Sequence, residues 1–377
     1  MDNATTYVGL DAHQDHIAVA MLRGQGREWT ELRFGGDRRG LEKLVRCLSE
    51  ETVKGAVVSA YEAGPLGYAL QRRLESAGIC CQVVAPSLIA VKPGDRIKTD
   101  RRDARKLALQ LRAGLLTAVC PPSEGEEAVR DLCRCREAAR EDLTRARHRL
   151  SKMLLRRGRV YRDSKPWTLK HRRWLRSQVW EHPADRTVFE EYLLAIEQLE
   201  DRHRALETAI EEQARQEIYR EPVSWLRCMR GFDTVNAMTV VAELHGIARF
   251  SSPRQLMAYL GLVPTESSSG HSRRQGGITK TGNRHARTAL INAAWHQRHT
   301  PRLGATLRAR RRGQPAAVIA LADRAQRRLN RRFLHLVLRR GKPPQKAVVA
   351  VARELVGLVW TLLVLYPRLA AAGELTT

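Results

Sequence analysis

The stretch Thr5-Thr-Tyr-Val-Gly-Leu-Asp11 is rich in β-forming residues and ends in an acid. Two more β-rich segments follow it, at residues 16–22 and 28–34. Three short strands in succession predict an antiparallel meander. The pattern then alternates, with a helix at 39–49, a strand at 56–61, a helix at 65–77 and a strand at 80–84. Strands that give way to alternating α and β elements predict an α/β domain with a mixed sheet.

The middle of the chain is dominated by two long helical patterns. A break at Pro121-Pro122 precedes them. Residues 126–159 and 186–219 are charged and carry apolar residues at three- and four-residue steps, which predicts a helical hairpin or coiled coil. An ordinary two-helix insertion packed on its own domain is the alternative. Residues 164–174 between them are basic and aromatic, a candidate nucleic-acid contact.

We therefore expect an α/β domain followed by all-α regions. The expected boundaries are 1–121 for the mixed-sheet domain, 122–220 for the helical hairpin or coiled coil, and 221–377 for a mostly helical C-terminal domain. A Gly- and Ser-rich loop at 261–282 interrupts the last region. The apolar stretch 347–366 contains Arg353 and Glu354, which predicts a buried helix and no membrane segment.

Charge points to the partner of the chain. Lys and Arg number 66 against 40 Asp and Glu, a formal net charge of +26, which favours a polyanion such as nucleic acid. A ribosomal or nucleoid structural protein would be as basic, so charge alone does not separate an enzyme from a packaging protein. The seven cysteines form no CxxC pair, which predicts reduced thiols. With no export signal expected, we place the chain in the cytoplasm, at the bacterial nucleoid.

Four acids stand at the ends of predicted elements. Asp11 ends the first strand, Glu62 follows a later one, and Asp100 and Asp103 stand three apart where a helix begins after Lys98. Strand ends share a sheet edge and an i, i+3 pair shares a helix face, so the four acids have a common focus. Taken singly, each acid is better explained as a strand end, a turn or a helix cap. Together, in a very basic chain, they predict a magnesium cage for phosphoryl transfer on DNA or RNA.

A second group of residues surrounds the stretch Gly261-Leu-Val-Pro-Thr-Glu-Ser-Ser-Ser-Gly270. A serine directly before glycine in a flexible loop is open to the close approach of a phosphate. Without further context, a Ser/Gly linker is the better explanation. Lys280, Arg284 and Arg287 follow the loop and would supply positive charge for a phosphate.

A third feature is a basic run at residues 302–342, where thirteen Lys and Arg face the single acid Asp323. A solvated helix face rarely needs so one-sided a charge, so we favour phosphate contact. The nucleic-acid-binding residues expected in its first part are Arg308, Arg310, Arg311 and Arg312.

Two blocks of motifs give these features a specific likeness. The first block consists of Gly9-Leu-Asp-Ala-His13, Tyr61-Glu-Ala-Gly64 and Lys98-Thr-Asp-Arg-Arg-Asp-Ala104. The second consists of Gly261-Leu-Val-Pro264, Ser268-Ser-Gly270, Gly277-Ile-Thr-Lys280 and Gly282-Asn283. In order and spacing the chain resembles the DEDD transposases of insertion-sequence family 110 and its sister group 1111, which include the pilin-gene invertase Piv. The likeness covers nearly the whole chain.

The resemblance implies a RuvC-like fold, itself RNase-H-like, and a metal site for two Mg²⁺ ions, with Mn²⁺ as a substitute. The implied metal ligands are Asp11, Glu62, Asp100 and Asp103. Ser269, with Ser268 as the second choice, would attack a DNA phosphate and form a covalent phosphoserine link. A noncoding bridge RNA would pair with donor and target DNA. The helical middle would make a homodimer, with a tetramer at the synapse.

Two departures from the family pattern stand out. Gln14 replaces the basic residue often found after the Asp-x-His motif, which removes one charge. Phe232-Asp233 replaces a more usual Ile-Gly in a segment like a helix-hairpin-helix, and the missing glycine limits close approach of a phosphate to the backbone.

Three other functions compete with this interpretation. A Holliday-junction resolvase or metal nuclease would use the four acids with water and form no covalent adduct. A site-specific DNA invertase would share the chemistry but act on an invertible segment. A basic structural protein would have no active site, so removing a carboxylate would change nothing.

Overall fold

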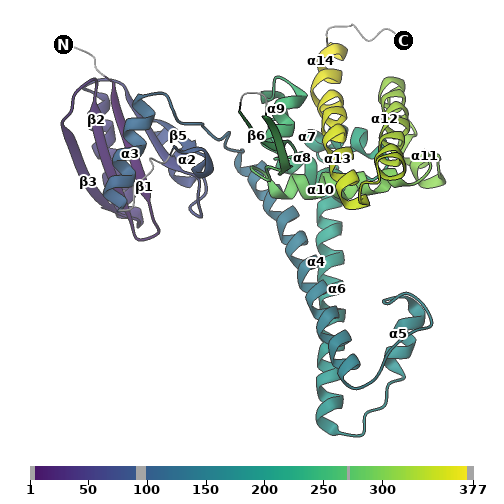
Figure 1. Cartoon of the computed structure of the whole chain (residues 1–377). Helices are drawn as coiled ribbons and strands as arrows, with labels where there is room; N and C mark the ends of the chain where they lie inside the picture. The colour runs from purple at the N-terminus through teal and green to yellow at the C-terminus, as the bar shows by residue number, and fades with distance from the viewer. Residues whose placement is uncertain (1–4, 91–98, 270–271, 372–377) are drawn as a thin grey trace. The chain divides into compact units, whose positions relative to one another are not determined.

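The structure is a computed structural model that describes residues 5–90, 99–269 and 272–371. The motif residues Lys98 and Gly270 lie outside the described residues. The chain divides into two compact units, Met1–Pro121 and Pro122–Thr377, and each is described by itself. Figure 1 labels most of the helices and strands of both units.

The first unit is built on a five-stranded sheet in the order β3-β2-β1-β4-β5. Its strands are β1 (Thr6–Ala12), β2 (His16–Arg23), β3 (Trp29–Gly35), β4 (Val57–Glu62) and β5 (Cys80–Val84). β1, β2 and β3 pair antiparallel, while β4 pairs parallel with both β1 and β5. The predicted meander and the predicted mixed sheet are therefore confirmed.

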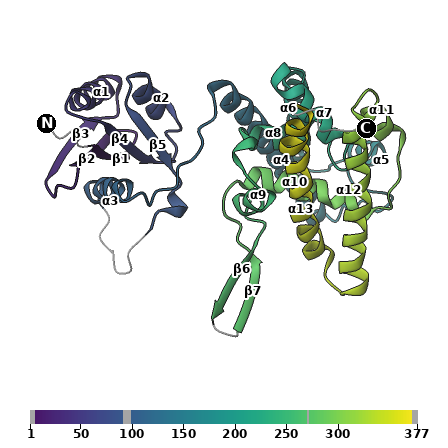
Figure 2. The same ribbon diagram turned by 90° about the horizontal axis from the view of Figure 1, so that it is seen from above.

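Three helices cover the two faces of this sheet (Figure 2). α1 (Arg38–Thr52) and α2 (Ala69–Ser76) bury leucines against one face, and α3 (Asp100–Arg112) lies on the other. Alternate residues of β2 serve the two faces, because successive side chains of a strand point to opposite sides. The helix predicted from residue 65 begins only at Ala69, since the preceding residues form a turn in which Gly67 has a positive φ of 59°.

The second unit begins with a long helical hairpin of α4 (Glu124–Arg156) and α6 (Pro183–Gln213), with α5 (Leu169–Arg176) at its far end (Figure 1). The two long predicted helices are confirmed. Leu150, Phe189 and Ile196 are buried between them. The aromatic residues of the connecting segment pack on one another, with the Trp167 and His171 rings 5.2 Å apart, so they belong to this small core.

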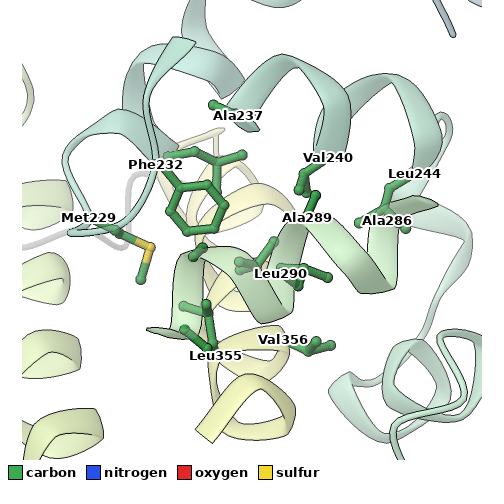
Figure 3. Packing of buried hydrophobic residues seen from close by; sticks show 14 of the residues in the cluster. Met229, Phe232, Ala237, Val240, Leu244, Ala286, Ala289, Leu290, Leu355 and Val356 are labelled. Atoms are coloured by element: carbon green, nitrogen blue, oxygen red, sulfur yellow. The ribbon is translucent and has the colours of Figure 1, made fainter. Parts of the chain in front are cut away.

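The other helices of the second unit enclose its main core. They are α7 (Glu217–Arg227), α8 (Thr234–Glu243), α9 (Pro253–Tyr259), α10 (Arg284–Trp295), α11 (Ala305–Arg311), α12 (Ala316–Leu334), α13 (Pro344–Trp360) and α14 (Tyr366–Ala371). Short 3₁₀ or π turns lie at Pro86–Leu88 in the first unit and at Ile247–Arg249, His296–Arg298, His335–Arg339 and Thr361–Leu365 in the second. Figure 3 shows Phe232, Leu290 and Leu355 facing one another in this core. The boundary expected between residues 220 and 221 falls inside α7.

One helical run in the described part of the chain, Pro344–Ala371, is long and apolar enough to cross a membrane by length and composition alone. Val351, Leu355 and Val359 of this run are fully buried in the main core. Burial against α9, α10 and α12 explains its apolar sequence, as predicted for residues 347–366.

The Gly- and Ser-rich segment is not a loop throughout, which corrects the sequence interpretation. β6 (Pro264–Ser269) and β7 (Ser272–Ile278) form an antiparallel hairpin that extends away from α9 (Figure 2). Glycine and serine content pointed to a linker, but cross-strand backbone pairing needs no apolar side chains. A side-chain contact adds to it, because Gln275 Nε2 donates to Glu266 Oε2 at 3.1 Å.

Candidate active site

The first group of acids gathers at one edge of the sheet. β1 and β4 run parallel, and their last registered pair is Leu10 with Tyr61. Asp11 and Glu62 are the next residue on each strand, so they leave the sheet at the same edge. Asp11 is half-buried and Glu62 is exposed.

Helix α3 brings the other two acids to this edge. The Thr99 side chain caps the helix by accepting from the Arg102 backbone N–H at 3.3 Å. Asp100 and Asp103 then fall in the first turn, where the helix dipole favours negative charge. Gly9 lets α3 lie directly on β1, because a Cβ at this position would overlap the Ala104 carbonyl oxygen.

Two histidines at the turn between β1 and β2 complete the group, and sequence reasoning gave neither of them a role. His13 Nε2 lies 3.4 Å from Asp11 Oδ2 and 3.7 Å from Asp100 Oδ1. His16 Nε2 lies 2.8 Å from Asp100 Oδ2. The available signal was the spacing itself, since a tight turn joining two strands places both ends of the turn beside Asp11.

The electrostatics of this edge favour a bound cation. Burial raises the pKa of Asp11; His13 opposes that shift, while Asp100 and Asp103 add to it through repulsion. The hydrogen bond with His16 lowers the pKa of Asp100. One ligand atom each from Asp11, His13 and Asp100 lies within 4.8 Å of the others. Such a donor set of carboxylate oxygens and an imidazole nitrogen fits a divalent metal ion.

The predicted serine lies in the second unit, at the end of β6. Ser269 is exposed and pairs in register with Ser272 of β7. Ser268 differs from it, because its hydroxyl donates to Glu266 Oε1 at 2.9 Å. A serine at the tip of a projecting hairpin is accessible to a phosphate, as the nucleophile of the sequence prediction must be.

A polar network holds the base of this hairpin. Asn283 caps α10 by accepting from the Ala286 backbone N–H at 3.0 Å, and its Nδ2 donates to Glu243 Oε2 at 2.7 Å. Glu243 is fully buried and also accepts from Arg134 of α4 at 2.7 and 2.9 Å. Arg287, expected to contact phosphate, donates through Nη1 to the Leu260 and Thr281 carbonyls, so its observed contacts hold the chain at the hairpin base.

The expected basic residues differ in exposure. Lys280, Arg284, Arg308 and Arg312 are exposed, and Arg310 is half-buried and donates to the Phe232 carbonyl. The structure does not support the expected nucleic-acid contact of Arg311. This side chain is only 5% exposed, donates through Nε to the Cys228 carbonyl at 3.0 Å and pairs with Asp323 at 2.6 Å. The Arg311 charge is paired within the fold because Asp323, the single acid of the basic run, lies on the next helix, α12.

Comparison with known proteins places these groups in a family. A family model described as Transposase matches residues 8–157, and one described as Transposase IS116/IS110/IS902 family matches residues 223–308. A putative transposase, y4qE, of Sinorhizobium fredii is 40% identical over 367 residues, covering 96% of this chain and 89% of its own length. This chain belongs to the IS110 family of transposases.

Other relatives agree. The transposase for insertion sequence element IS1533 of Leptospira borgpetersenii is 34% identical over 340 residues, covering 89% of this chain and 98% of its own length. That for insertion sequence element IS1111A of Coxiella burnetii is 38% identical over 101 residues, which is 25% of this chain and 28% of its own length. This transposase is therefore an enzyme of DNA transposition and recombination. The first family match contains all four acids and the second contains Ser269.

Proposed function

We propose that this transposase cuts and rejoins DNA through a covalent intermediate on Ser269, assisted by Mg²⁺ bound to the carboxylate edge. The metal ligands of this proposal are Asp11, Glu62, Asp100 and Asp103. The observation that carries it is the convergence of Asp11 and Asp100 from β1 and α3, with Glu62 next on the adjacent strand. The mixed sheet with acids at one edge supports a RuvC-like, RNase-H-like fold for residues 1–121.

The Ser269 hydroxyl is the nucleophile of the proposed reaction. The Ser269 hydroxyl gives up its proton and its Oγ bonds to phosphorus, while the bond from phosphorus to the leaving sugar oxygen breaks and that oxygen takes a proton. A second strand end then attacks the phosphoserine through its sugar hydroxyl, which restores Ser269 and rejoins the DNA. Divalent ions held by Asp11, Glu62, Asp100 and Asp103 would stabilise the charge that develops on the phosphate oxygens. Serine is a weak nucleophile at neutral pH, so the Ser269 hydroxyl and the metal held by the four acids must act on the same phosphate.

Basic side chains support nucleic-acid binding at the base of the serine hairpin and along α11. Lys280 and Arg284 are exposed at the hairpin base and the start of α10, while Arg308 and Arg312 are exposed around α11. Arg310 and Arg287 are half-buried as well as donating to backbone carbonyls, so we assign them a smaller share than the exposed Arg308. With a net charge of +26, the chain suits two polyanions, the element DNA and a noncoding bridge RNA.

The domain roles follow the same proposal. Residues 1–121 bind the metal, residues 122–220 carry the helical hairpin that would pair two copies as a coiled coil, and residues 221–377 present the serine. Two such dimers would form a tetramer at the synapse. The reaction takes place at the nucleoid, in the cytoplasm of the bacterium.

The test traps the covalent adduct on a labelled element-end substrate with Mg²⁺ and the cognate RNA, then maps the modified peptide. Ser269→Ala should abolish the adduct and recombination, whereas the matched Ser268→Ala variant should keep both. Efficient cleavage without an adduct by a variant that carries both Ser268→Ala and Ser269→Ala would show that water is the nucleophile and favour a resolvase or nuclease. Mixing Ser269→Ala with Asp11→Ala protein restores activity only if two chains share a site.

A further inference from the structure

The carboxylate edge contains a nitrogen donor that the four-acid proposal leaves unused. His13 Nε2 faces Asp11 Oδ2 at 3.4 Å and Asp100 Oδ1 at 3.7 Å, so one imidazole nitrogen looks toward oxygens from two different elements. Its side chain is 50% exposed, which leaves the ring open to an ion from solvent. A buried histidine that merely satisfied one carboxylate would have neither property.

The local fold holds this imidazole in place. The His13 backbone N–H donates to the His16 carbonyl at 2.8 Å, which closes the tight turn between β1 and β2. The antiparallel pair of Ala12 with Ile17 anchors both ends of that turn in the sheet. His13 therefore stands at a fixed backbone position two residues beyond Asp11, and only its side-chain torsions remain to be set.

His16 has a different environment. Its Nε2 bonds to Asp100 Oδ2 at 2.8 Å, the carboxylate oxygen other than the one nearest His13, and its side chain is only 21% exposed. The two rings lie 5.3 Å apart between centroids. Asp100 is thus held from one side by His16 while its Oδ1 lies 3.7 Å from His13 Nε2. A ligating carboxylate is commonly fixed by such a hydrogen bond.

We propose that His13 is a nitrogen ligand of the divalent ion at this edge and that His16 positions Asp100 as its ligand. This inference rests on the metal site proposed above. An imidazole in the donor set raises affinity for transition metals more than for Mg²⁺, which prefers oxygen. The site therefore discriminates between Mn²⁺ and Mg²⁺ more strongly than a cage made of carboxylates alone.

The test uses the full chain with Mn²⁺ as the probe and needs no DNA. A nitrogen bound directly to Mn²⁺ modulates its electron spin echo, and calorimetry gives the affinity. Wild type should show the nitrogen modulation. His13→Ala should lose it, bind Mn²⁺ at least about 10-fold more weakly and change in Mg²⁺ affinity by less than about threefold. His13→Gln, which keeps most of the side-chain size, should lose the modulation too, and unchanged thermal unfolding of both variants shows that they are folded.

The matched control is His16→Gln, which should keep the modulation and weaken Mn²⁺ binding by about 10-fold through the freed Asp100. Absence of nitrogen modulation from Mn²⁺ bound to wild type would overturn the inference. So would modulation that survives in His13→Ala and disappears in His16→Gln. Failure of the metal site itself gives a different result, because Asp11→Asn and Asp100→Asn would then bind Mn²⁺ as tightly as wild type.

Discussion

Replacing Glu243 by Gln tests whether the network at the hairpin base stabilises the second unit. Glu243 is 0% exposed, and both of its oxygens accept from donors, two from Arg134 and one from Asn283. Gln has the same shape but must point its own NH₂ group at one of these donors. The substitution therefore removes a charge and sets two donors against each other inside the protein.

The expected loss follows from the burial of the pair. Breaking a buried ion pair by removing one partner costs about 3–5 kcal/mol. Arg134 is 37% exposed and can turn partly to water, so we expect the lower end, about 3 kcal/mol. For a unit as large as Pro122–Thr377, a loss of this size lowers Tm by about 6–12 °C.

The assay is thermal and urea unfolding of the full chain, with hydrogen exchange to assign each transition to its unit. Glu354→Gln is the matched control in the same unit, since Glu354 pairs with the exposed side chains of Arg328 and Arg332 and its replacement should cost less than about 1 kcal/mol. If Glu243→Gln loses no more stability than this control, the network does not stabilise the fold as reasoned.

Three further outcomes are expected. Gly9→Ala should destabilise the first unit by about 1–3 kcal/mol and weaken Mn²⁺ binding, because the new Cβ displaces α3; Gly125→Ala, which has open space in α4, should do neither, as unfolding and calorimetry would show. Arg311→Ala should lower unfolding stability by about 1–3 kcal/mol, whereas Arg312→Ala should leave it unchanged and reduce the salt slope of nucleic-acid binding by about one. Burial raises the pKa of Glu243, but hydrogen bonds from its donors outweigh that and hold the pKa below its usual 4.5. Its stabilisation is therefore present above about pH 4.5 and lost as pH falls through the lower folded pKa. The stability gap between wild type and Glu243→Gln should shrink in acid urea titrations.

Elements with strong local patterns were predictable from the sequence. β5 occupies the predicted residues 80–84, and the two long helices of the second unit begin within three residues of their predicted starts. Their signals lie within short windows of chain, in β-rich runs or apolar steps of three and four. The placement of α3 on the sheet was not predictable in this way, because it depends on a glycine about a hundred residues away in sequence, Gly9.

The approach of Asp11 and Asp100 to one edge was predictable from the sequence, whereas the approach of His13 and His16 to them was not. Strand and helix ends gave Asp11, Glu62 and Asp100, whereas the sequence signal for the two histidines is only their place at a tight turn, which does not mark either ring as a donor. The burial of Arg311 was not predictable for a related reason. A run of arginines in sequence shows its total charge, while burial of one member depends on a partner, Asp323, that only the packing of α11 and α12 reveals.

The serine hairpin raises the question of what fixes its direction. None of the hairpin side chains that the structure describes is buried, so no core of its own orients it. Its base is fixed instead. The backbone at Gly282 lies so close to the Tyr259 carbonyl that a Cβ there would overlap it, and the Asn283 side chain is bound to Glu243. Through Glu243 the base is joined to Arg134 on α4, the first long helix of the helical hairpin. A change in the helical hairpin therefore has a direct polar route, from Arg134 through Glu243 to Asn283, to the start of α10 and the base of the hairpin that carries Ser269.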